Sequence, residues 1–266
     1  MYARTARLSV ALLVAAPLAA ALHAQGVEYA AGTTKYRIST TTKGSQSGPS
    51  GASTAFEVGI QEQITVNLMK HARDTVMATF TMDSIAIKSA GPIPDVSKLV
   101  GAQWVSLVSP TGKFYSAKAA TVSVDPQLTQ ILEGLKTFLP SYRGGIATGS
   151  TWSDTTSGKV SQQGMDLDRV SVSTFKVAGD TTIGGQKALR VERVTTVKAS
   201  GSGTMQGTPV MMETTGTSNG AFFLAPKGVY LGGSSTDDVS VKITILAQNA
   251  EFNIKQVAQN KVETIK

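Results

Sequence analysis

The chain has 266 residues and is mildly basic, with 25 Lys or Arg residues against 18 Asp or Glu residues. The basic residues are scattered, so they form neither a nucleic-acid arm nor a polybasic membrane patch, and we expect no nucleic-acid partner. The absence of cysteine excludes disulfides and thiol nucleophiles.

Residues 1–24 have the order of a secretory signal peptide. Arg4 and Arg7 precede an apolar run that ends before Gln25, and this run is shorter than the roughly 20 residues of a comfortable membrane span. We take Ala24 as the last residue of the signal. The mature chain is therefore expected to be exported, to the periplasm or beyond, and not to span a membrane after signal cleavage.

Alternating apolar and polar residues predict antiparallel β-strands along the mature chain. A first strand is expected at 27–43, followed by a flexible connector at 43–53 that carries almost no apolar side chain. Two strands follow on either side of a turn at 72–74. In the second of them Ile85 is out of phase with Met82, so we predict a bulge between these two residues.

Glu62 interrupts the alternation, because it falls on the apolar side of its strand between Ile60 and Ile64. Unpaired acids are rarely buried, so the favoured interpretation is that the strand passes beyond the edge of the core there. A carboxylate that faces a cavity is the alternative.

One amphipathic helix is predicted at 125–139. Asp125 suits the N-cap, Pro126 suits the first helical position, and Pro140 ends the segment. Burial of one large apolar side chain stabilises by roughly 1.5–3 kcal/mol, so this helix must cover an apolar surface. Its apolar stripe consists of Leu128, Ile131, Leu132, Leu135, Phe138 and Leu139.

Two segments of the first half recur in the second half, and internal similarity of this kind points to a repeated architecture. ITVNLMKHARDT at 64–75 resembles VSVSTFKVAGDT at 170–181, which is expected to turn at 179–180. VSLVSPTGKFY at 105–115 shares an apolar run and a Pro-x-Gly turn with GAFFLAPKGVY at 220–230. Proline presets φ at one corner and glycine supplies a positive φ, so both segments are predicted hairpins.

These elements predict a mainly β (α+β) protein. After the signal peptide we expect a single domain at 25–266, made of two related halves at about 25–140 and 145–266. The expected architecture is a curved antiparallel sheet or half-barrel with the amphipathic helix packed on it.

Familiar catalytic motifs are missing. His71 is the mature chain's only histidine, it lies next to a predicted turn, and no G-x-S-x-G motif accompanies it. We expect it to face solvent, and we expect neither an enzyme nor a cofactor. Calcium needs only oxygen ligands, and 166–168 and 237–238 are the candidate acid pairs, although acids capping turns are the favoured interpretation.

The pattern of a signal peptide, long Thr-rich strands, a central helix and Pro-x-Gly hairpins is similar to uncharacterised secreted β-rich families of Gram-negative bacteria. It more distantly resembles the curved sheets of periplasmic lipoprotein carriers. This resemblance implies a bent sheet whose concave face is covered by the helix, with an apolar cavity between them. The residues expected to line that cavity are Phe80, Met82, Trp104, Leu128, Ile131, Leu132, Leu135 and Phe138.

Three functions remain open at the level of the sequence. The leading hypothesis is an exported, non-catalytic binding or carrier module for an apolar or lipid ligand. The second is a structural or protein-interaction component of the bacterial envelope that has no small-molecule ligand. The third is a hydrolase that uses paired carboxylates. The sequence predicts no oligomeric state.

Overall fold

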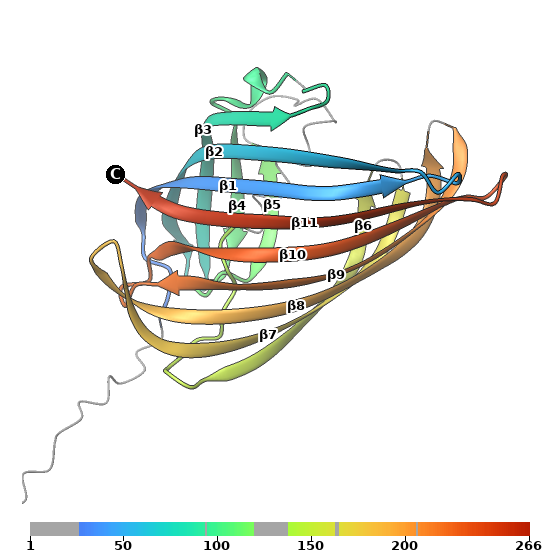
Figure 1. Ribbon diagram of the computed structural model, residues 1–266. Helices are drawn as coiled ribbons and strands as arrows, with labels where there is room; N and C mark the ends of the chain where they lie inside the picture. Colours follow the sequence, from blue (N-terminus) through green and yellow to red (C-terminus); the bar gives the residue numbers. More distant parts are fainter. Residues whose placement is uncertain (1–26, 94, 120–137, 163–164, 206) are drawn as a thin grey trace, which may run out of the picture.

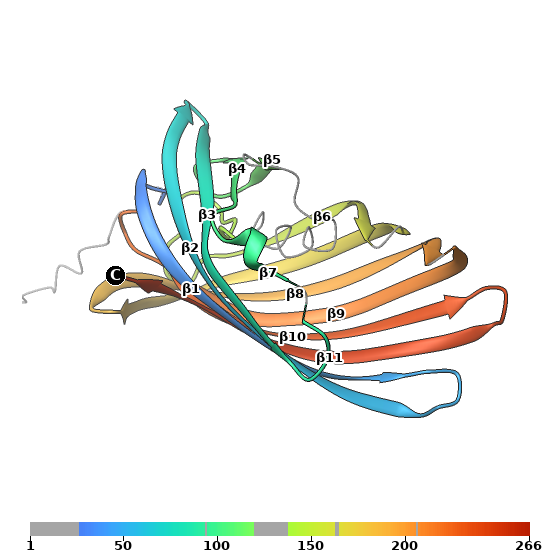
Figure 2. The ribbon, with the colours of Figure 1, turned by 90° about the horizontal axis from the view of Figure 1, so that it is seen from above.

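The computed structural model describes residues 27–93, 95–119, 138–162, 165–205 and 207–266, which form one curved sheet (Figures 1 and 2). The elements are β1 (Gly32–Ser47), β2 (Ser53–Ala72), β3 (Thr75–Ser89), the 3-10 turn η1 (Ser97–Leu99), β4 (Gln103–Val108), β5 (Phe114–Ala119), β6 (Thr151–Gln162), β7 (Met165–Ile183), β8 (Gln186–Met205), β9 (Thr208–Leu224), β10 (Tyr230–Ile245) and β11 (Ala250–Ile265). The predicted curved antiparallel sheet is confirmed.

The first and last strands pair at the middle of the sheet. The strand order is β5-β4-β3-β2-β1-β11-β10-β9-β8-β7-β6, with antiparallel neighbours throughout, so the two edges come from the middle of the chain. Figure 2 shows that the sheet bends along this order, which gives it a concave inner face and a convex outer face. The strands belong to one sheet, and the two related halves stay a prediction.

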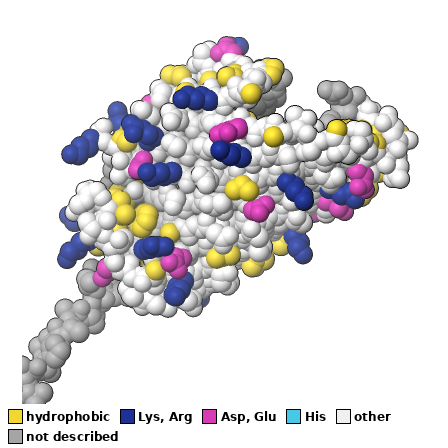
Figure 3. All heavy atoms as spheres, in the orientation of Figure 1, with side chains coloured by type: hydrophobic (Ala, Val, Ile, Leu, Met, Phe, Trp, Pro, Cys, Tyr) yellow, Lys and Arg dark blue, Asp and Glu magenta, His cyan; other side chains and the backbone are white. Residues whose placement is uncertain are grey.

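Side-chain alternation separates the two faces. In β2 the buried positions Glu62, Ile64 and Val66 alternate with the more exposed Gln63 and Thr65, as expected for a strand with one covered side. The outer face, which is turned toward the viewer in Figure 3, carries scattered Lys, Arg, Asp and Glu side chains with separate hydrophobic side chains between them. The apolar core therefore lies on the inner face.

The predicted bulge after Met82 is confirmed. Gln63 pairs with Ser84 and Ile64 pairs with Met82, so Asp83 has no partner in the ladder. The extra residue brings Ile85 to the same face as Met82, which is the inner face.

Both predicted Pro-x-Gly hairpins are confirmed, and they share one hydrogen-bond pattern. In the first, the Gly112 N–H donates to the Ser109 carbonyl, and in the second the Gly228 N–H donates to the Ala225 carbonyl. Gly112 and Gly228 have φ of 84° and 76°, where glycine is favoured. The two turns also hold the N-terminal segment, because the Tyr29 N–H donates to the carbonyl of Pro110 at 2.7 Å.

Two other predicted boundaries are wrong. The connector expected at 43–53 is mostly strand, because β1 and β2 remain paired as far as Ser47 and Ser53 through backbone hydrogen bonds that need no apolar side chains. The turn expected at 179–180 is a bulge inside β7, and the chain turns instead at 184–185.

The predicted helix at 125–139 lies outside the described residues except for Phe138 and Leu139. These two residues have no helical backbone, so the predicted helix end is wrong. In the described parts of the chain the only helical element is the short turn η1. None of these parts contains a helix long and apolar enough to cross a membrane.

Candidate functional site

Cross-strand pairing arranges the inner face in three zones. The first, which we call the inner cluster, is a buried apolar cluster that contains Tyr36, Ile64, Phe80, Met82, Trp104, Phe175, Val191, Phe222 and Tyr230. The second, the polar band, runs across the sheet as two neighbouring rows. The first row contains Arg193, Ser235, Asn260 and Thr40, and the second contains Ser173, Thr195, Ser218 and Asp237. The third, the distal cluster, contains the buried Met165, Leu167, Val210 and Met212. An apolar zone thus lies on each side of a polar one.

The inner cluster is built around the ring of Phe138. The centroid of this ring lies 5.0 Å from that of Tyr36, 6.1 Å from that of Phe80 and 5.5 Å from that of Tyr230, all with edge-to-face geometry. Each such aromatic pair contributes about 0.5–1.5 kcal/mol beyond its area burial. These contacts therefore hold Phe138, the first described residue after position 137, firmly against the sheet.

The residues that the sequence predicted as cavity lining divide into three groups. Phe80, Met82 and Trp104 lie together in the inner cluster with 1%, 0% and 4% exposure, and the rings of Phe80 and Trp104 stack 5.6 Å apart. Phe138 lines a cavity. The predicted positions Leu128, Ile131, Leu132 and Leu135 lie outside the described residues. A ligand-lining role for any of them stays a prediction.

That cavity lies at the border between the inner cluster and the polar band. Its volume is about 170 Å³, and it is lined by Phe138, Pro140, Arg193, Ala221, Phe222, Tyr230, Gly233, Ser234, Ser235, Asn260 and Val262. A bulge between Tyr230 and Gly232 turns the ring of Tyr230 to the inner face, opposite Leu224. Gly233 leaves part of the wall without a side chain, so the cavity has apolar and polar sides.

Asn260 organises the polar side through three hydrogen bonds. Its amide nitrogen donates to the Asp237 carboxylate at 2.7 Å and to the Ser235 hydroxyl at 3.2 Å. Its amide oxygen accepts a hydrogen bond from the Thr40 hydroxyl at 2.9 Å. The second carboxylate oxygen of Asp237 is buried and has no hydrogen-bond partner in the described residues. The network joins β1, β10 and β11 and fixes the amide of Asn260.

Arg193 supplies the positive charge of this site. It lies on β8 with its side chain half-buried at the cavity wall, and it has neither an ion pair nor a hydrogen bond with any other described residue. Arg193 and Tyr230 line the same cavity. Burial and the neighbouring Tyr36 raise the pKa of the Tyr230 phenol, and the charge of Arg193 acts in the opposite direction.

Glu62 lies on the inner face between its cross-strand partners Ile38 of β1 and Ile85 of β3. Ile38 in turn pairs with Val262, which lines the cavity. Glu62 is only 9% exposed, so the expectation that its strand passes beyond the core is wrong. Burial raises the pKa of this carboxyl to about 7. Within the described residues nothing pairs with it, and it is a buried acid in a mostly apolar setting.

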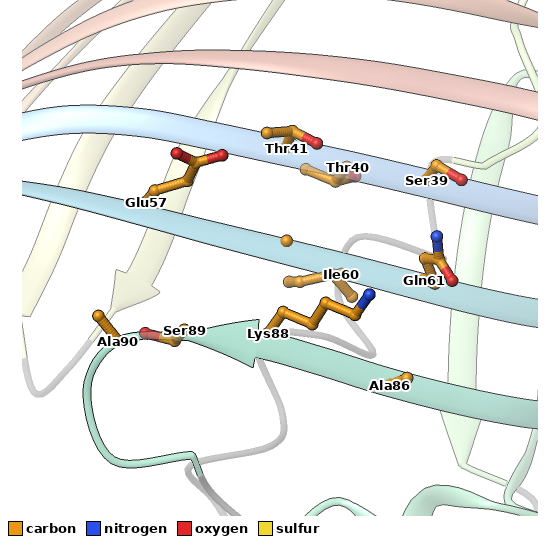
Figure 4. A pocket seen from close by; sticks show the side chains of 11 residues that line it. Ser39, Thr40, Thr41, Glu57, Ile60, Gln61, Ala86, Lys88, Ser89 and Ala90 are labelled. Atoms are coloured by element: carbon orange, nitrogen blue, oxygen red, sulfur yellow. The ribbon is translucent and has the colours of Figure 1, made fainter.

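The outer face has a wide, shallow furrow across β1, β2 and β3 (Figure 4). Gly59 leaves its floor without a side chain, and the surrounding side chains include Glu57, Gln61 and Lys88, which do not converge on one point in Figure 4. Glu57 forms an exposed ion pair with Lys43 at 3.4 Å. This arrangement is that of a solvated sheet surface, so the inner face is the better candidate site.

The candidate catalytic and calcium residues lie on separate strands in the described chain. His71 is exposed beside the β2–β3 turn, as predicted, and Asp166 and Asp168 lie on the outer side of β7. Asp237 and Asp238 lie inside β10 and point to opposite faces, so their interpretation as turn residues is wrong. The described ranges contain no group of three or more His, Asp or Glu residues that could hold a metal ion.

No protein-family model matches the chain, and no curated protein matches it in sequence. Among solved structures, the crystal structure of Neisserial surface protein A aligns over 86% of this chain and 98% of its own, with 10% identity and a TM-score of 0.17. A DUF1329 family protein from Desulfovibrio piger aligns over 84% of each chain, with 7% identity and a TM-score of 0.15. TM-scores this low carry no argument about function, so the function is inferred from the residues of the chain itself.

Proposed function

We propose that this protein is an exported, non-catalytic binding module that holds an amphiphile with its apolar chain along the inner face of the sheet. The observation that carries this proposal is a row of half-buried apolar side chains on the concave face, which is separated from the cavity by the one polar row that contains Asp237. We call this row the distal inner face, and it consists of Val197, Ala199, Val239, Val241, Ile243 and Ile254.

The dimensions of the inner face fit an acyl chain. From Ser235 at the cavity to Ile243 beside the distal cluster, β10 extends about 26 Å at roughly 3.3 Å per residue. The acyl chains of one leaflet fill half of a hydrocarbon core that is about 30 Å thick, which is about 15 Å. One such chain can therefore lie along β10 between the polar band and the distal cluster.

The expected affinity follows from the buried methylene groups. Each buried methylene contributes about 0.8 kcal/mol, so about ten of them contribute on the order of 8 kcal/mol before the cost of association is subtracted. Binding costs of several kcal/mol reduce the net affinity of a plain alkyl chain to weaker than micromolar. A polar head group that finds its own partners is then needed for tight binding.

A second function is favoured by the edge strand β6. Its residues Thr151–Gln162 pair with β7 on one side only, and the outer edge of the strand has no partner in the described sheet. An unpaired edge of this length can accept a strand from another chain. An envelope component that binds a protein partner through β6 is therefore the alternative.

The test is native mass spectrometry of the mature protein purified from its own host, followed by delipidation and titration with a single-chain lysophospholipid. We expect a stoichiometric adduct. In the variant Val241→Trp the indole occupies the distal inner face, so affinity should fall about tenfold or more. The control Ser240→Trp places the same indole on the outer face of the same strand and should bind as the parent does.

Thermal unfolding of both variants shows whether each is folded before binding is compared. A clean mass, together with no uptake of the lysophospholipid by the delipidated protein, would overturn the carrier proposal. That outcome would leave the β6 edge as the better explanation of what the protein does.

A further inference from the structure

We infer that the cavity beside the polar band binds an anionic group, a phosphate or a carboxylate, and that this group is the head of the amphiphile. Arg193 and Ser235 are the residues that hold it. This inference rests on the proposed function, because it assigns the head-group chemistry of the same ligand.

The first observation is the unmatched charge of Arg193. Lys242, the other half-buried basic residue of the described strands, lies 2.6 Å from Glu251, and the remaining basic residues of these strands are exposed to solvent. Arg193 is half-buried at the wall of the cavity that Phe138 also lines, and it has no acid partner in the described chain. A partly desolvated guanidinium is stabilised by an anion, and its planar donors match phosphate and carboxylate oxygens.

The second observation is the hydroxyl of Ser235. Its oxygen accepts a hydrogen bond from the amide of Asn260 at 3.2 Å, which leaves the hydroxyl proton available as a donor to the cavity. The amide nitrogen of Asn260 donates one proton to Ser235 and the other to Asp237. A rotation that brought the amide oxygen to the cavity as an acceptor would break both of these hydrogen bonds. The polar side of the cavity is therefore rich in donors.

Asp237, the acid of the polar band, does not occupy this site. Asp237 lies one row further along β10 and does not line the cavity, and its carboxylate is held by Asn260. Arg193 and Asp237 are separated by two strand spacings and one two-residue step, which places their Cα atoms about 12 Å apart. The two side chains form no ion pair, so within the described residues no acid neutralises the guanidinium.

The size of the cavity indicates a head group rather than a whole ligand. Its volume of about 170 Å³ is close to the roughly 150 Å³ of a cavity that accommodates one benzene molecule. A phosphate or carboxylate with its first carbons fits this space, and the remaining chain has to leave along the distal inner face. Free phosphate offers the same anionic chemistry, but it would leave the apolar walls of Phe138, Phe222 and Val262 uncovered.

The experiment compares four probes on the delipidated mature protein by isothermal titration calorimetry, below the critical micelle concentrations. The probes are a lysophosphatidic acid, the fatty acid and the neutral monoacylglycerol with the same chain, and inorganic phosphate. We expect both anionic amphiphiles to bind at least about tenfold more tightly than the monoacylglycerol, because hydrogen bonds to charged groups are the strong ones. Inorganic phosphate should bind much more weakly than lysophosphatidic acid.

Variants assign the effect to residues. Arg193→Gln should abolish the preference for the anionic probes, because it should weaken lysophosphatidic acid and the fatty acid far more than monoacylglycerol. Arg190→Gln removes the same charge from the outer face of the same strand, and it should retain the full preference. Ser235→Ala should weaken lysophosphatidic acid by a factor at least about threefold larger than it weakens monoacylglycerol.

The possible failures are distinguishable. If monoacylglycerol binds as tightly as the anionic probes, or if Arg193→Gln keeps the preference, the head-group inference is wrong while the carrier proposal stands. If inorganic phosphate binds as tightly as lysophosphatidic acid, the cavity is a site for a free anion, and the inference is overturned. If no probe with an alkyl chain binds, the carrier proposal itself fails.

Discussion

Replacement of the buried Glu62 by Gln should make the protein more stable at neutral pH and hardly change it in acid. Glutamine has nearly the same shape and never ionises, so it removes the charge and keeps the packing between Ile38 and Ile85. Burial raises the pKa of Glu62 to about 7 from an ordinary value of 4.5. At about 1.4 kcal/mol for each tenfold change in proton affinity, the ionised carboxyl destabilises the folded protein by about 3 kcal/mol above pH 7.

The direction of the pH dependence follows from which state holds the proton. Below about pH 4.5 the carboxyl is protonated in both the folded and the unfolded chain, so the wild-type protein has no penalty there. Between about pH 4.5 and pH 7 the unfolded chain has lost the proton while the folded protein keeps it, and stability falls as the pH rises. Above about pH 7 both states are ionised and the difference is constant.

Urea unfolding followed by tryptophan fluorescence, from about pH 4 to pH 8, measures this difference. The stability of Glu62→Gln relative to wild type should increase by about 3 kcal/mol across the range. Glu57→Gln is the matched control on the outer face of β2, where the exposed ion pair with Lys43 contributes below about 1 kcal/mol. Equal pH profiles for Glu62→Gln and the wild-type protein would refute burial of an acid at this position.

Two further stability predictions follow from the hairpins and the polar band. A Cβ on Gly228 would overlap a backbone carbonyl of the N-terminal segment, so Gly228→Ala should lower the free energy of unfolding by about 2 kcal/mol or more in a denaturation assay. A Cβ on Gly158 would meet open space, so the control Gly158→Ala should be nearly neutral in the same assay. Asn260→Ala removes three side-chain hydrogen bonds and leaves the carboxylate of Asp237 unpaired, so thermal unfolding should show a loss of about 2–3 kcal/mol. Asn253→Ala, on the outer face of the same strand, should unfold like the wild type.

Much of the local structure is readable from the sequence, because it depends on near neighbours. The out-of-phase Ile85 identified the bulge at Asp83, and the two Pro-x-Gly segments identified hairpins whose turns share one hydrogen-bond pattern. The error at 179–180 has a local cause as well. Gly179, with φ of 136°, forms a bulge, and the pair Gly184-Gly185, with φ of 55° and 80°, makes the two-residue turn.

The candidate site is not readable in this way. Arg193, Ser235 and Asn260 belong to β8, β10 and β11, and no short motif contains any two of them. They meet in one row because β9 pairs with both β8 and β10 in a definite register. A slip of β8, β10 or β11 by one residue would turn its member of the row to the outer face, and side-chain alternation alone does not fix which residues stand opposite each other.

The pairing of β1 with β11 has a consequence for how the chain assembles. Strands β1 to β5 form one meander of sequential neighbours, strands β6 to β11 form another, and a single ladder between the two ends of the sequence joins them. Each meander can fold through contacts that are short in sequence, while the joining ladder closes the longest loop in the protein and should form late. A circular permutant that links β11 to β1 and opens the chain between β5 and β6 would convert this ladder into a local hairpin. Such a permutant would place all eleven strands in sequential order, and it should fold faster than the natural arrangement to the same sheet.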